Sequence, residues 1–87
     1  FDFPRMPEVC LFIQPDFAKP VRERYANKPE CLEAQKDGSL RLTLHDVAEH
    51  EAVDLIFWAR GQVKVISPDS LRQTIIDIAE TVLRLQS

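Results

Sequence analysis

Basic side chains are the residues of this sequence that are best suited to do chemistry, because they recur on several short segments that one fold can bring together. We single out Arg22, Arg24, Arg41 and Lys64 as candidate ligands for phosphate groups, with Arg72 as a further member of the set. Arginine offers a planar fork of donors and lysine a compact charge. The opposing interpretation is that all of them are ordinary solvated charges, which their acidic neighbours in the sequence favour.

Other reactive residue types form weaker candidate sites. Phe12 would suit the stacking of a nucleic-acid base, although packing against a neighbouring domain explains an exposed aromatic side chain better. Cys10 with His45 could form a nucleophile pair, but no orienting carboxylate or glycine elbow accompanies it. His50 and Asp54 lie one helical turn apart and have no third spaced metal ligand. We therefore expect no enzymatic activity, no metal and no cofactor.

Composition restricts the class of protein. The chain has 87 residues, of which 45% are hydrophobic, and only 2 glycines, which is typical of one globular domain. Its formal net charge is −3. A domain that binds nucleic acid on its own normally has a basic balance, so the charge argues against that function.

The cysteines and the hydropathy pattern bear on location. Cys10 and Cys31 follow no disulfide or metal-binding spacing, so we interpret them as free thiols in a reducing cytoplasm. No apolar run approaches the ~20 residues that cross a bilayer, and no secretory signal is visible. We expect a cytoplasmic domain without membrane contact.

Hydrophobic periodicity predicts the elements that must position these side chains. Strands are predicted at residues 9–14, 30–35, 40–45 and 63–66, and helices open at Asp16, at Asp46 and at Pro68. Residues 1–7 have no period and are interpreted as a linker from a preceding domain.

Local signals set the ends of these elements. Asp46 and Glu49 have the spacing of a capping box at a helix start, and Gly61 suits a helix end. Ser67 is the predicted cap of the last helix, with Pro68 at its first position. The Asp-Gly pair within residues 36–39 predicts a hairpin between the second and third strands.

The resulting order, β-α-β-β-α-β-α, predicts an α+β fold of the ferredoxin-like type with an added C-terminal helix. Its sheet is expected to be four-stranded and antiparallel, with the first and third strands central and both crossover helices on one face. We place these residues on the open face: Cys10, Phe12, Gln14, Arg41, Thr43, His45 and Lys64.

The alternation along the strands also predicts the core. The predicted core residues are Val9, Leu40, Leu42, Leu44, Phe57, Trp58, Val65 and Ile75. The terminal helix has a wider apolar surface than one sheet face requires, because Ile76 and Leu83 lie beside its main stripe. We predict that this surplus packs on a second copy or on another domain.

Six short motifs, in this order and spacing, resemble a known family: Val21–Arg24, Asp37–Ser39, Leu40–Leu44, Trp58–Gly61, Val63–Pro68 and Leu71–Arg72. They are similar to the C-terminal extension (WCX) domain of WYL-domain bacterial transcriptional regulators. The resemblance covers roughly residues 8–86, so residues 8–87 are interpreted as that domain. The chain begins at Phe1 and not at Met, which suggests a piece of a longer protein.

The resemblance implies partners and a function. Such regulators have a winged helix that binds operator DNA and a WYL domain that senses a nucleic-acid or nucleotide effector. The extension domain is implied to assist dimerisation and to complete the effector pocket. The expected partners are the WYL domain of the same chain, a second copy, single-stranded nucleic acid or a nucleotide, and operator DNA through the winged helix.

Two other functions remain open at this point. An ACT-like small-molecule sensor shares the predicted topology and often dimerises, and a purely structural dimerisation module has the same pattern. The sequence that precedes Phe1 would distinguish the regulator domain from the ACT-like sensor, because it would contain a WYL domain in the first case and an enzyme or transporter in the second. Sequence does not separate the structural dimerisation module from either.

Overall fold

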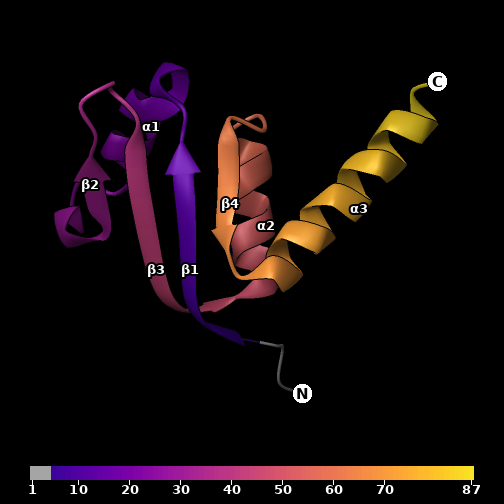
Figure 1. The fold of residues 1–87 in the computed structure, drawn as a ribbon, viewed down its shortest axis with the longest axis horizontal. Coiled ribbons are helices and arrows are strands. Elements are labelled where there is room, and N and C mark those ends of the chain that lie inside the picture. Colours follow the sequence, from indigo (N-terminus) through magenta and orange to yellow (C-terminus); the bar gives the residue numbers. More distant parts are fainter. Residues whose placement is uncertain (1–4) are drawn as a thin grey trace.

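A computed structural model describes residues 5–87 of the chain (Figure 1). The elements follow in the order β1 (Arg5–Ile13), α1 (Ala18–Arg24), β2 (Leu32–Ala34), β3 (Leu40–Ala48), α2 (Glu49–Trp58), β4 (Val63–Ser67) and α3 (Asp69–Leu85). Short 3₁₀ turns at Pro15–Phe17 and Pro29–Cys31 precede α1 and β2. The succession of strands and helices is the predicted one.

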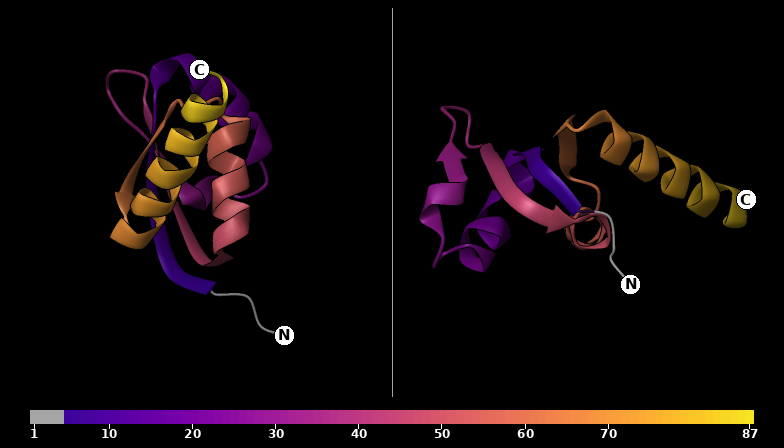
Figure 2. Two further views of the ribbon diagram at one scale, coloured as in Figure 1. Left: turned by 90° about the vertical axis from the view of Figure 1, so that its right-hand side faces the viewer. Right: turned by 90° about the horizontal axis from the view of Figure 1, so that it is seen from below.

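The four strands form one antiparallel sheet in the order β2-β3-β1-β4. The predicted α+β fold with β1 and β3 in the centre is confirmed, and the three-residue strand β2 lies at an edge. Figure 2 shows α1 and α2 on the same side of the sheet. No helix within residues 5–87 covers the other face of β1 and β3, which is therefore open (Figure 2).

The core lies between the sheet and these two helices. Val9, Leu11 and Ile13 alternate along β1 and have no exposed surface, and Val21 of α1 and Ile56 of α2 pack against them. Because successive side chains of a strand point to opposite faces, the same alternation places the intervening residues of β1 on the open face.

Most of the predicted core residues are confirmed, but two aromatic residues are not. Leu40, Leu42 and Val65 are buried, and Leu44 and Ile75 are partly buried against the core. Phe57 and Trp58 are each 40% exposed, so their assignment to the core was wrong. The apolar residues of α2 are spread around most of its circumference. The residues that face the core are Ala52, Leu55 and Ile56.

The predicted hairpin between β2 and β3 is confirmed. The backbone N–H of Gln35 donates to the carbonyl of Ser39, and the carboxylate of Asp37 accepts bonds from the N–H and the hydroxyl of Ser39. Gly38 has a φ of +92°, a conformation that glycine adopts without steric cost.

The predicted capping box at the start of α2 is wrong. Asp46 lies within β3 with a φ of +51°, where the strand changes direction, and α2 begins at Glu49 without a side-chain cap. The Asp46 carboxylate instead accepts a hydrogen bond from Nε of Arg5 at 2.8 Å. Asp46 is therefore bonded to Arg5 of the neighbouring strand β1 and does not cap α2.

Three other predicted boundaries differ from the structure. β1 begins at Arg5, so it overlaps the linker predicted at residues 1–7, of which residues 1–4 lie outside the described part. Neither Asp16 nor Ser67 caps a helix, because α1 follows Phe17 and α3 follows Pro68 without side-chain capping bonds.

The last helix, α3, extends away from the sheet (Figures 1 and 2). Leu71 in its first turn is buried, and Ile75 is partly buried against the core. Further along, Val82, Leu83 and Leu85 are 48%, 71% and 76% exposed. An apolar stripe that begins in the core thus continues into solvent, and the predicted surplus of apolar surface is present.

Candidate nucleic-acid interface

A row of three side chains crosses the open face of the sheet. Phe12 on β1 pairs with Arg41 on β3 and with Lys64 on β4 in the strand register. Directly paired residues of neighbouring strands point to the same face. Strands lie ~4.8 Å apart, so Phe12 sits midway between two cations whose backbones are ~10 Å apart. We call Arg41, Phe12 and Lys64 the open-face row.

Arg41 is held in position by its neighbours. Its Nε donates to the Sγ of buried Cys10 at 3.2 Å. This hydrogen bond is the main cause of a raised pKa at Arg41, and the negative charges of Glu33 and Glu8 add to it. Arg41 is thus a cation bonded to the neighbouring strand β1, and Glu33 lies beside it as its partner in the register of β2.

Phe12 has a shallow hollow on each side. One, of about 540 Å³, is lined by Phe12, Gln14, Lys64, Val65, Ile66 and Arg72. The other, of about 370 Å³, is lined by Phe12, Gln35, Lys36, Asp37 and Ser39. Phe12 is common to both linings, and the larger hollow adjoins Lys64 and Arg72, whereas the smaller one adjoins Lys36 and Asp37.

Arg22 and Arg24 do not join the open-face row. Both belong to α1, which covers the opposite face of the sheet. The guanidinium of Arg24 lies over the ring of Trp58 at 4.6 Å from its centroid, and Phe17 meets the same ring edge-on at 5.3 Å. The structure therefore divides the four predicted basic residues into two pairs on opposite faces.

The other candidate sites of the sequence are not assembled. Cys10 pairs with Thr43 in the register, whereas His45 pairs with Glu8, so the cysteine and the histidine do not face each other. Both cysteines are free thiols, as the sequence indicated. Along residues 5–87, no group of three or more potential metal ligands lies together.

The prediction that Phe12, Arg41 and Lys64 share the open face is confirmed by the strand register, and Arg72, the further candidate, lines a hollow beside them. Arg72 lines the larger hollow together with Gln14 and Ile66, although it lies on α3 and not on the sheet. No sequence signal gives the direction in which α3 leaves β4, and that direction decides whether Arg72 reaches the hollow.

None of the helices within residues 5–87 has the length and apolar character that spanning a membrane requires.

Comparison with known proteins identifies the family. The sequence model of the WCX domain matches residues 6–83, which is nearly the whole chain. No curated protein matches the sequence. Because the match extends from the first central strand to the last turns of α3, it includes every element that positions the open-face row. The chain belongs to the WCX domain family.

Proposed function

We propose that this domain is the effector-sensing and oligomerisation part of a WYL-type transcriptional regulator, and that its open-face row contacts a nucleic-acid or nucleotide effector. The observation that carries the proposal is the register that places Phe12 between Arg41 and Lys64. An aromatic ring on an open sheet with cations beside it suits one stacked base and its flanking phosphates.

The net charge of the domain determines how strongly this site alone could bind nucleic acid. The net charge of −3 opposes the approach of a polyanion, and salt screens a few phosphate contacts easily. The domain alone should therefore bind a single strand weakly or not at all. In the intact regulator, the WYL domain would supply further contacts and the open-face row would close the pocket.

The test is a titration of the full-length regulator with short oligonucleotides and nucleotides at fixed salt. Arg41→Ala should weaken effector binding by ~1–3 kcal/mol, because it removes a charge-assisted contact. Operator binding without effector should barely change. Arg22→Ala is the matched control, since it removes the same charge from the other side of the sheet. Equal effector affinity of both variants and the wild type would contradict the proposal.

A second observation supports oligomerisation. Along α3 the apolar residues Leu71, Ile75, Ile78, Val82 and Leu85 recur at alternating spacings of four and three, as in the seam of a coiled coil. Small residues, Thr74, Ala79 and Thr81, flank this seam and would let a second helix approach closely. We assign the exposed part of the seam to contact with a second copy of the chain.

A further inference from the structure

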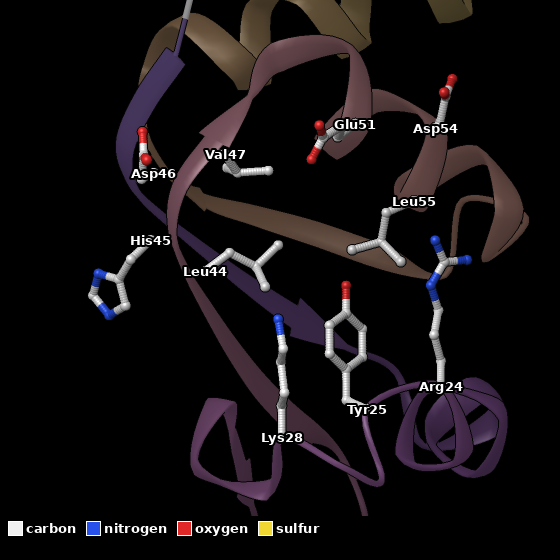
Figure 3. Close-up of a pocket in the computed structure, with 10 residues that line it drawn as sticks. All are labelled: Arg24, Tyr25, Lys28, Leu44, His45, Asp46, Val47, Glu51, Asp54 and Leu55. Atoms are coloured by element: carbon white, nitrogen blue, oxygen red, sulfur yellow. The ribbon is translucent and has the colours of Figure 1, made fainter.

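A hollow on the helix-covered side of the sheet has no role in the function proposed above. It lies between the end of α1 and α2, above the curved end of β3, and its volume is about 520 Å³ (Figure 3). Because α1 has only seven residues, it leaves this part of β3 uncovered. Leu44, Val47 and Leu55 give the hollow an apolar lining.

Charged side chains of opposite sign line the two sides of this hollow. Arg24 and Lys28 come from α1 and the turn that follows it, whereas Glu51 and Asp54 come from α2 (Figure 3). No salt bridge within 4.0 Å joins the two sides in the part of the chain that the structure describes. The hollow therefore has Arg24 and Lys28 on one side and Glu51 on the other, whereas the Asp54 carboxylate is directed away from it (Figure 3).

The remaining polar groups of the rim do not disturb this arrangement. Asp46 is paired with Arg5, whose Nε lies 2.8 Å from its carboxylate. The ring of His45 points away from the other side chains (Figure 3). Neither residue adds an uncompensated charge to the space between Lys28 and Glu51.

Tyr25 supplies a neutral donor on the basic side. Its hydroxyl rises toward Leu44 and Leu55 beside the side chain of Lys28 (Figure 3). Burial is the main cause of a raised pKa at Tyr25, so the phenol stays protonated at neutral pH and can donate to an anion. The Arg24 guanidinium lies over the Trp58 ring, and its charge and hydrogen bonding partly offset the effect of burial on the pKa of Tyr25.

We infer that this hollow binds a free α-amino acid with an apolar side chain. The ligand carboxylate would lie against Lys28, Arg24 and the Tyr25 hydroxyl, and its ammonium group against Glu51. A nucleotide would meet the carboxylate of Glu51 here, and a simple cation would meet two basic side chains, whereas a zwitterion matches both sides. The site is distinct from the open-face row, so the inference does not depend on the proposed effector.

The experiment follows backbone amide shifts of the ¹⁵N-labelled chain during titration with L-leucine, L-valine and L-phenylalanine. At least one of them should give saturable shifts confined to residues 24–28, 44–47 and 51–55. The corresponding amide, such as L-leucinamide, lacks the carboxylate, and N-acetyl-L-leucine lacks the ammonium group. Each should bind about tenfold more weakly, as expected for the loss of one charge-assisted contact.

Two charge-removing variants complete the test. Lys28→Gln should weaken binding of the amino acid about tenfold and leave binding of the amide unchanged, and Glu51→Gln should do the same with respect to the N-acetyl derivative. Lys19→Gln and Glu23→Gln remove the same charges from exposed positions of α1 that do not line the hollow. The amide spectrum of each variant reports directly whether it is folded.

Three results would overturn the inference. One is the absence of saturable shifts with all three amino acids. Another is equal affinity for the amino acid and both of its blocked derivatives. The last is an unchanged affinity in folded Lys28→Gln and Glu51→Gln chains. Failure of these tests would leave the open-face row unaffected, since its titration uses other ligands and other variants.

Discussion

Replacing Leu85 by alanine tests whether the exposed seam of α3 mediates self-association. Leu85 belongs to the seam and is 76% exposed, so its side chain contributes little to the fold of one chain. Alanine is a strong helix former, and α3 itself should persist. We expect Leu85→Ala to weaken association of two chains without changing the stability of either.

The exposed fraction sets the size of this effect. Full burial of a leucine side chain stabilises by ~1.5–3 kcal/mol, so burial of the exposed part of Leu85 would stabilise by ~1–2 kcal/mol. A two-fold symmetric dimer contains the residue twice, which raises the expected loss to ~2–4 kcal/mol. This free energy corresponds to an increase of about 30- to 700-fold in the dimer dissociation constant.

Size-exclusion chromatography with light scattering measures the dissociation constant across a concentration series. Glu80→Ala is the matched control, because Glu80 is exposed on the side of α3 opposite to the seam. It should leave association unchanged. A wild-type chain that stays monomeric at ~1 mM would refute the reasoning, since this concentration detects an association of only ~4 kcal/mol. Equal dissociation constants for the two variants would also refute it.

Three further predictions concern the fold. Leu42 has no exposed surface, so Leu42→Ala should lower the free energy of unfolding by ~2–4 kcal/mol in chemical denaturation, and a loss below ~1 kcal/mol would contradict its place in the core. Gly38→Ala should cost ~1–2 kcal/mol in the same assay through backbone strain alone, because its φ is +92° and the added Cβ would lie an ordinary 3.6 Å from Pro15. The hydrogen bonds from the hydroxyl and then the N–H of Ser39 lower the pKa of Asp37. The Asp37 carboxylate therefore stabilises the fold above about pH 4, and this contribution is lost as the pH falls through the lowered pKa. Asp37→Asn should flatten the dependence of stability on pH in that acidic range, and an unchanged dependence would show that the carboxylate does not contribute.

Elements with local signals were predictable from the sequence. The alternation of Leu40 and Leu42 fixed the inward face of β3, and the Asp-Gly pair at Gly38 fixed the hairpin. Asp46 was predicted wrongly because its capping pattern is local, whereas its partner Arg5 is 41 residues away in the sequence. A salt bridge between residues that are far apart in the sequence produces no recognisable pattern within a few consecutive residues.

The direction of a helix with apolar residues on several sides was not predictable. In α2 the small residue Ala52 faces the sheet together with Leu55 and Ile56, and the larger Phe57 faces outward. Size and hydrophobicity alone favoured Phe57 as a core residue. The packing of α2 against the sheet determines which of its apolar residues face the core, and this packing is known only from the tertiary structure.

Of the two candidate sites, the sequence predicted one and missed the other. Strand alternation predicted that Arg41, Phe12 and Lys64 share a face, and the register places them in one row. The hollow between Lys28 and Glu51 was missed, because its residues come from a turn and a helix whose separation depends on the length of α1. Neither residue belongs to a motif.

The contact of Trp58 with Arg24 and Phe17 has a spectroscopic consequence. Trp58 is the only tryptophan of the chain, so all of the indole fluorescence originates where α1 meets α2. The ring is partly exposed, and a cation lies 4.6 Å from its centroid. The emission wavelength and the quenching by added iodide are therefore natural reporters of the separation between these two helices, without any introduced label.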